Sequence, residues 1–137
     1  RLKTLSGAGP WTQAHTLYSD YKFGLVMENT KQKGYVSEKI LNAFIGGTIP
    51  IYYGTEDVFN IFNRDAFIFF DQNRPQETLV SVQELLLDDE KYRAMLAQPI
   101  LVEGAFENYF AFYGKGQTSG DIRKFMGISA HPPEEDD

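Results

Sequence analysis

Three short apolar runs alternate with helical patterns between residues 21 and 70. The run 21–27 lacks clean alternation of apolar and polar positions, and its length and composition favour a buried strand over a helix. Similar runs follow at 48–53 and 66–70. Pro50 interrupts the second run, and a proline normally restricts a strand to a sheet edge or distorts it. We nevertheless predict a strand there.

Helical patterns occupy the intervals between these runs. Ser37 is a good N-cap candidate, and apolar residues follow it at helical spacing until Gly46 and Gly47 end the helix. Thr55 is placed to cap a second, short helix whose first turn is acidic. Strands that alternate with helices through short connections are typical of βαβ units. The sequence therefore predicts an α/β fold with a parallel sheet covered on both faces.

Beyond Pro75 the pattern becomes helical, because apolar residues recur at intervals of three and four. A flexible loop at 114–120 and a disordered acidic tail follow. Three apolar stripes carry this helical pattern: Leu79, Val82, Leu85 and Leu86; Tyr92, Met95 and Leu96; and Phe106, Tyr109, Phe110 and Tyr113. We interpret the third stripe as core or interface packing rather than as a stacking platform.

Composition narrows the class of protein. The 137 residues suit one domain, and 42% hydrophobic with 23% charged residues exclude wholesale disorder. No apolar stretch is long enough to span a membrane or to form a signal-peptide core. The absence of cysteine excludes disulfides, thiolate metal sites and cysteine nucleophiles. Because the chain starts at Arg1, we expect it to be a segment of a longer polypeptide, and its compartment stays open.

The net charge of −6 is unevenly distributed along the chain. Four acidic residues lie at 134–137, whereas residues 1–39 carry six Lys or Arg against three acidic residues. This basic stretch favours a small anionic ligand. A duplex nucleic acid is not expected, since it would require clustered Lys and Arg along one face of a basic domain.

Ligands of open parallel sheets bind beyond the carboxyl ends of the strands, which here points to residues 28–39 and 54–57. A helix N-terminus with Lys39 suits a phosphate, and Glu38 suits a ribose or sugar diol. On residue chemistry alone, a Glu-Lys pair at this position is more often a pair of ordinary surface charges in a first helical turn. Tyr35 can stack on a base or cover the core, and Glu28 with Asn29 can bind a ligand or only fix the turn.

Other chemistries lack their usual motifs. His15 and His131 are far apart in sequence, and neither His-Glu-x-x-His nor Asp-x-Asp occurs, so we predict no metal site. The Gly-x-Ser-x-Gly and Gly-x-Gly-x-x-Gly patterns of hydrolases and dehydrogenases are also absent. The glycines at 114 and 116 do not complete a phosphate-binding loop, and we interpret them as part of a flexible connection.

Four ordered blocks resemble the donor-binding signature of the α-1,3-fucosyltransferases. They are Tyr21-Lys-Phe-Gly-Leu-Val-Met-Glu-Asn29, Gly34-Tyr-Val-Ser-Glu-Lys-Ile40, Asn42-Ala and Thr48-Ile-Pro-Ile-Tyr-Tyr-Gly54. The likeness is close over residues 21–71 and looser beyond. Three positions depart conservatively from the family pattern, with Met27 for Phe, Thr30 for Ser and Ser37 for Thr.

This resemblance implies the C-terminal, GDP-fucose-binding half of a GT-B glycosyltransferase, with a Rossmann-like parallel sheet and a helical C-terminal portion. It implies inverting, metal-independent transfer of L-fucose to a hydroxyl of an acceptor glycan, with no cofactor besides the donor. Lys39 then corresponds to a residue at the diphosphate and Glu38 to one at donor hydroxyls. The full set of donor-binding candidates is Glu28, Asn29, Tyr35, Ser37, Glu38 and Lys39.

The division of the chain follows from the same resemblance. We expect residues 1–20 to lead in from an upstream domain, 21–128 to form the donor-binding domain and 129–137 to be a flexible tail. The acceptor domain, its general base and a phosphate-binding arginine have no counterpart in residues 1–20, so this segment alone is expected to be inactive. The competing hypothesis is a non-catalytic Rossmann-like module that binds a nucleotide or a partner. The compartment would be cytoplasmic or membrane-peripheral in a bacterium and the Golgi lumen in a eukaryote.

Overall fold

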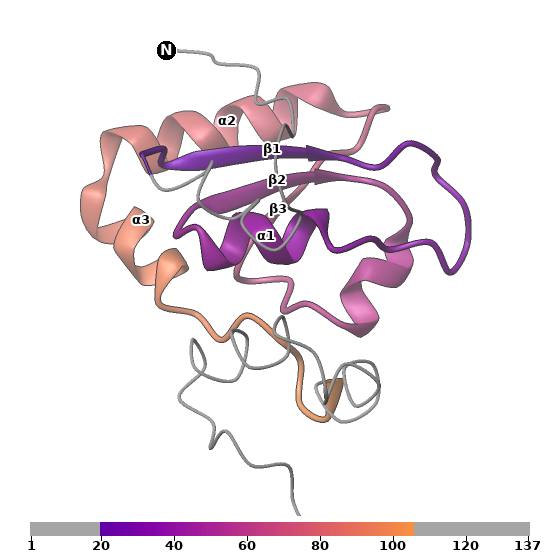
Figure 1. Ribbon diagram of the computed structural model, residues 1–137. Helices are drawn as coiled ribbons and strands as arrows, with labels where there is room; N and C mark the ends of the chain where they lie inside the picture. Colours follow the sequence, from indigo (N-terminus) through magenta and orange to yellow (C-terminus); the bar gives the residue numbers. More distant parts are fainter. Residues whose placement is uncertain (1–19, 106–137) are drawn as a thin grey trace, which may run out of the picture.

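Three parallel strands form the centre of the computed structural model, which describes residues 20–105 (Figure 1). The order in the sheet is β1-β2-β3, with β1 at Phe23–Met27, β2 at Ile49–Tyr53 and β3 at Ile68–Phe69. Strands β1 and β2 pair in parallel along their whole length, from Phe23 with Ile49 to Met27 with Tyr53. The parallel α/β sheet predicted from the sequence is confirmed, although β3 is shorter than the apolar run that predicts it.

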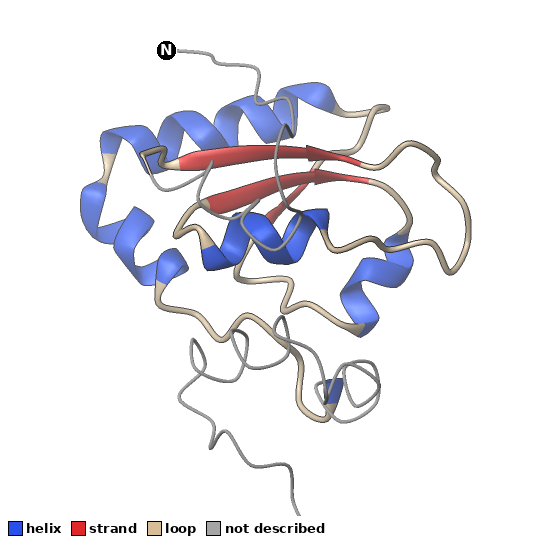
Figure 2. Ribbon diagram, in the orientation of Figure 1, coloured by secondary structure: helices blue, strands red, loops and turns tan. Residues whose placement is uncertain are grey.

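The helices follow the predicted alternation with the strands (Figure 2). Helix α1 (Lys39–Ile45) connects β1 to β2, and the 3-10 turn η2 (Glu56–Asn60) follows β2. Helices α2 (Pro75–Leu87) and α3 (Asp89–Leu96) come after β3. The described part of the chain contains no helix with the length and apolar character required to cross a membrane.

Pro50 lies in β2, the middle strand of the three, and not in an edge strand as its residue type suggests. The hydrogen bonds explain why it is tolerated. Ile49 N donates to Lys22 O on the β1 side, whereas Tyr52 O accepts from Phe70 N on the β3 side. Pro50, two residues before Tyr52, therefore faces β3, and pairing with β3 begins only at Ile51. The missing N–H of Pro50 costs no ladder bond.

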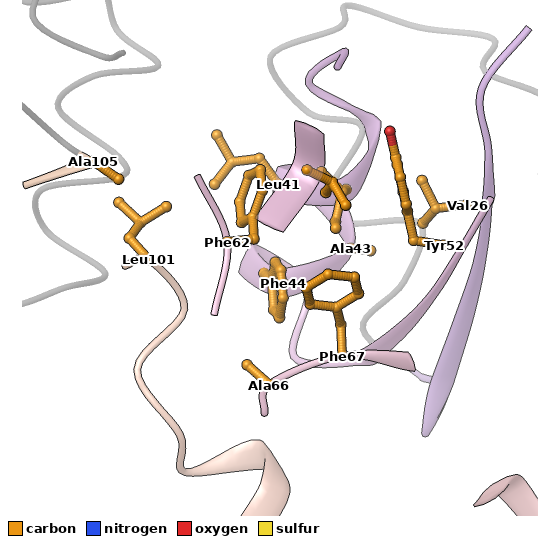
Figure 3. Packing of buried hydrophobic residues seen from close by; sticks show 12 residues of the cluster. Val26, Leu41, Ala43, Phe44, Tyr52, Phe62, Ala66, Phe67, Leu101 and Ala105 are labelled. Carbon is orange, nitrogen blue, oxygen red and sulfur yellow. The ribbon is translucent and has the colours of Figure 1, made fainter. Parts of the chain in front are cut away.

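Two apolar clusters cover opposite faces of the sheet. Alternate residues of β2 separate them, since Tyr52 belongs to the α1 cluster and Ile49 to the α2 and α3 cluster. The larger cluster includes Phe44 of α1 and Phe62 and Phe67 from the segment before β3 (Figure 3). Phe44 and Phe62 stack with ring centroids 5.6 Å apart. Both faces of the sheet are covered, as predicted.

Two residues of the strand predicted to be buried are exposed instead, and so are several apolar residues of the helices. Leu25 and Met27 of β1 are 60% and 52% exposed, because β1 is the end strand of the described sheet and the α2 cluster extends only over Phe23 on that strand. On α2 only Val82 and Leu85 pack against the sheet. The other members of the predicted stripes, Leu79, Leu86 and Leu96, are exposed. The third stripe at 106–113, the loop at 114–120 and the tail lie outside the described residues.

Candidate functional site

The loops that follow β1 and β2 meet at the carboxyl edge of the sheet. Glu28 N donates to Tyr53 O at 3.0 Å, so the pairing of the two strands continues one residue beyond β1. Farther along the first loop, Gly34 N donates to Asp57 Oδ2 in η2. The segments 28–39 and 54–57, which the sequence indicates as two candidate ligand sites, therefore lie together at one edge of the sheet.

Glu28 is buried under the start of α1. Its Oε1 accepts hydrogen bonds from Ser37 N at 3.2 Å and from Ser37 Oγ at 2.7 Å. The N-cap of α1 is Glu38 and not Ser37 as predicted, and Glu38 makes no capping bond through its side chain. The hydroxyl of Ser37 is directed to Glu28 because that buried carboxylate is the stronger acceptor, and Ser37 Oγ accepts only a long 3.4 Å bond from Lys39 N.

Lys39 is the first residue of α1 and spans the gap back to β1. Its Nζ donates to Met27 O and to Asn29 Oδ1, both at 3.3 Å. These residues flank Glu28 on either side. The ammonium group is therefore held at the end of β1, where a parallel sheet collects its ligands.

Tyr35 and Glu38 lie in the same loop and are exposed. Tyr35 is 39% exposed. The carboxylate of Glu38 faces solvent next to Lys39. The ring of Tyr35 can stack on a base, and the carboxylate of Glu38 can accept hydrogen bonds from hydroxyls. The ammonium group of Lys39 can neutralise a phosphate.

The comparisons with known proteins agree with this geometry. The sequence model of "Glycosyltransferase family 10 (fucosyltransferase) C-term" matches residues 6–97. The chain belongs to glycosyltransferase family 10. The prediction made from the four sequence blocks is thereby confirmed.

Individual relatives of this family 10 chain include proteins from bacteria and animals. The α-(1,3)-fucosyltransferase FucT of Helicobacter pylori is 50% identical over 50 residues, covering 36% of this chain and 10% of that protein. The 4-galactosyl-N-acetylglucosaminide 3-α-L-fucosyltransferase 9 of Pan troglodytes is 35% identical over 77 residues, covering 54% of this chain and 21% of that protein.

Solved structures of α1,3-fucosyltransferase share the fold. One with GDP-fucose matches with a TM-score of 0.59 and 32% identity, covering 73% of this chain and 33% of that chain. One with GDP matches with a TM-score of 0.61 and 28% identity, covering 87% and 37%. The family 10 chain described here thus spans little more than a third of the solved structures' length, and less of the curated relatives quoted above.

Sequence reasoning did not associate Tyr52 and Gly54 with Glu28, although both lie beneath the site in this family 10 domain. Tyr52 is fully buried, and its burial together with the negative charge of Glu28 raises the pKa of its hydroxyl. A Cβ added at Gly54 would lie 2.5 Å from Tyr52 Oη and 2.9 Å from Glu28 Cγ, so only glycine fits between them. The alternation of β2 indicates that Tyr52 points inward, but nothing in the sequence pairs it with Glu28.

Asp57 anchors the tip of the loop. The hydrogen bond from Gly34 N, followed by the bond from the Thr55 hydroxyl, lowers the pKa of the Asp57 carboxyl below its ordinary 3.8. Gly34 has φ of 79°, a left-handed conformation that glycine adopts without strain. The hydrogen bond between Gly34 and Asp57 therefore fixes a tight turn at Gly34. This turn follows the basic residues Lys31 and Lys33 and precedes the start of α1.

A groove between β3 and α2 is a poorer candidate for an anion-binding site. Its lining includes Arg74 and Lys91, but both cations already face carboxylates. Arg74 lies 3.6 Å from Glu77, and Lys91 lies 3.0 Å from Glu84. Among residues 20–105, no group of three or more His, Cys, Asp or Glu is placed to hold a metal ion.

Proposed function

We propose that this chain is the donor-binding part of a fucosyltransferase that uses GDP-fucose. The observation that carries the proposal is the position of Lys39, whose ammonium group is held at the carboxyl edge of a parallel sheet in a family 10 domain. Support comes from the solved relatives, which hold GDP-fucose or GDP. The donor-binding domain is assigned to residues 21–128, between a lead-in and a tail.

The exposed residues around Lys39 supply the other contacts in this proposal. Lys39 binds the diphosphate, Glu38 accepts hydrogen bonds from donor hydroxyls, and Asn29 and Tyr35 line the nucleotide pocket. Glu28 and Ser37 are already bonded to each other beneath the turn, so they contribute through the shape of the site. This division of roles assigns each of the six predicted residues either to contact or to support.

The transfer reaction requires a second part of the enzyme. In our proposal, a general base from that part removes the proton of an acceptor-glycan hydroxyl, and the oxygen attacks the anomeric carbon of fucose with inversion. The bond from fucose to the diphosphate breaks at the same time. Lys39 stabilises the negative charge that develops on the departing GDP, because a fixed cation lowers the energy of the transition state more than that of the bound substrate.

Nucleotide selectivity tests the proposal. We expect the 137-residue chain to bind GDP saturably at about millimolar concentration and to prefer it to ADP and UDP, as measured by calorimetry or ligand-detected NMR. Equal binding of all three nucleotides would favour the competing hypothesis of a general nucleotide-binding module. The absence of any response would refute the donor-site assignment.

A further inference from the structure

The turn that presents Glu38 and Lys39 is fastened from below by one carboxylate. Glu28 is only 5% exposed, and its Oε1 receives both the N–H and the hydroxyl of Ser37. Ser37 directly precedes Glu38, so the bonds to Glu28 constrain the backbone where the turn begins. The 2.7 Å separation between the two oxygens is typical of a charge-assisted hydrogen bond.

The other oxygen of Glu28 has a complementary neighbour on β2. Within residues 20–105, the buried Glu28 Oε2 and the buried Tyr52 Oη both lack a hydrogen-bond partner. Figure 3 shows the Tyr52 ring beside Val26, with the hydroxyl directed away from Phe67. Since burial raises the pKa of Tyr52, its hydroxyl keeps the proton and offers a donor where Glu28 offers an acceptor.

Gly54 brings these two polar groups together. Because a Cβ at this position would overlap both Tyr52 Oη and Glu28 Cγ, each group lies against the same glycine. Buried polar groups without partners are costly, so a donor and an acceptor that share one small space satisfy each other directly or through a water molecule.

We propose that Glu28 is a positioning residue, held by Tyr52 and Gly54, which sets the orientation of Glu38 and Lys39 toward the nucleotide sugar. This inference rests on the proposed function. It assigns Glu28 no contact with the ligand, because its carboxylate is buried under the turn. Its effect on binding passes through Ser37, and a modest shift of that turn would move the Lys39 ammonium away from the diphosphate.

Ser37 variants test this inference most cleanly, because the side chain is small and partly exposed at the surface. Ser37→Ala removes the 2.7 Å bond to Glu28 together with the long 3.4 Å bond from Lys39 N, and it keeps the bond from the residue 37 N–H to Glu28. Ser37→Thr keeps a hydroxyl. Ser81→Ala is the matched control, since Ser81 Oγ donates to Glu77 O on α2, away from the site. All variants are made in the 137-residue chain.

The first measurement uses no nucleotide. Amide hydrogen exchange reports how firmly residues 37–39 are held, with Tyr92 in α3 as the internal reference. The informative amide is that of residue 37, which donates to Glu28 Oε1, whereas Lys39 N donates to the deleted hydroxyl itself. We expect Ser37→Ala to accelerate exchange at residue 37 by about tenfold and to leave Tyr92 unchanged. Unchanged exchange at residue 37 would overturn the role of Glu28 in holding the turn.

The second measurement is GDP affinity, by calorimetry at a temperature where each variant is folded. We expect Ser37→Ala to weaken GDP binding about tenfold, Ser37→Thr to restore it to within about twofold, and Ser81→Ala to leave it unchanged. If the parent binds GDP and Ser37→Ala binds it equally well, the positioning role is wrong while the proposed function stands. If the parent does not bind GDP, the proposed function itself fails.

Tyr52→Phe extends the test to the residue below. It deletes only the hydroxyl, and we expect GDP binding to weaken about threefold to tenfold because Glu28 Oε2 loses its donor. Tyr92→Phe is the control, since the Tyr92 hydroxyl donates to Lys22 O on the opposite side of the sheet. Equal GDP affinity of a folded Tyr52→Phe variant and the parent would remove Tyr52 from the proposal, and an unfolded variant would leave the Ser37 series to decide.

Discussion

Replacing Lys39 by alanine separates the stability of the fold from binding of the diphosphate. A cation in the first turn of a helix is mildly unfavourable, so the helix dipole alone predicts a neutral or slightly stabilising change. The contacts of Lys39 Nζ oppose that effect. Both are 3.3 Å long and lie at the surface, so their loss costs at most about 1 kcal/mol.

The expected effect on GDP binding is larger. A hydrogen bond to a charged group contributes about 1.5–3 kcal/mol, which corresponds to roughly 10–150-fold in affinity. The melting temperature without ligand should fall by no more than about 2–8 °C, the shift expected for 1 kcal/mol in a small domain. Lys39→Ala therefore weakens GDP binding far more than it destabilises the chain.

Two controls make this measurement specific. Lys91→Ala removes an exposed ion pair with Glu84 at 3.0 Å, so it should cost similar stability and leave GDP affinity unchanged. Guanosine lacks the diphosphate, and its binding, followed by ligand-detected NMR, should be equal in the parent and in Lys39→Ala. GDP affinity of Lys39→Ala within about twofold of the parent would refute the role of Lys39 at the diphosphate.

Four further outcomes are expected. Gly54→Ala should lower the free energy of unfolding by about 1–3 kcal/mol in chemical denaturation, because its Cβ would overlap Tyr52 Oη at 2.5 Å; unchanged stability would show that the ring can move. The pKa of Asp57 is lowered on folding, so its contribution to stability is complete above 3.8 and is lost as the pH falls through the folded value. The NMR chemical shift of the Gly34 amide should follow this titration, with a midpoint below pH 3.8. The titration should disappear in Asp57→Asn. A midpoint at or above 3.8 would contradict the contact. EDTA should leave GDP affinity unchanged, because Asp-x-Asp is absent and residues 20–105 offer no cluster of metal ligands; a tenfold loss restored by Mn²⁺ would reveal a site. The 137-residue chain should transfer no fucose above background, since it is expected to lack the general base, and measurable turnover would contradict that division of the enzyme.

Local sequence signals predicted the end of α1 and the start of η2 correctly. Gly46 closes α1 and Gly47 has φ of 83°, which explains why the helix stops where the paired glycines indicate. Thr55 accepts a bond from Asp57 N at the start of η2, as its position before two acidic residues suggests. These two features depend on neighbouring residues only, so they can be inferred from the sequence itself. The cap predicted at Ser37 fails because Ser37 bonds to Glu28, nine residues earlier in the chain.

The extent of burial could not be inferred in the same way. Helical periodicity places Leu79 and Leu86 on one stripe with Leu85, but it does not reveal how wide a surface the sheet offers to α2. Likewise, the apolar run 21–27 predicts a strand and does not show that Leu25 lies beyond the helices that cover the sheet. Burial depends on the partner as much as on the element.

The candidate site combines both cases. The family blocks and the predicted start of the helix placed Lys39 near the end of β1. This prediction depends only on the order of the elements along the chain. Glu28 and Tyr52 come from neighbouring strands and both lie against Gly54, and Ser37 has its hydroxyl on Glu28 although its position favours a cap. Such contacts follow from how the strands pair and how tightly Gly54 packs, and these are properties of the assembled sheet.

The loop between Glu28 and Ser37 shows why supporting contacts matter for binding. It exposes Lys31, Lys33 and Tyr35 and has little apolar surface to bury, so its order depends on polar anchors. Glu28 and Lys39 close its base, and Asp57 holds its tip through Gly34 N. Ordering the backbone of one residue costs about 1–2 kcal/mol in conformational entropy. When polar contacts already order the loop in the free protein, ligand binding has a smaller entropy cost and the affinity is higher. Buried and peripheral carboxylates can thus control the affinity for an anionic ligand that they never touch.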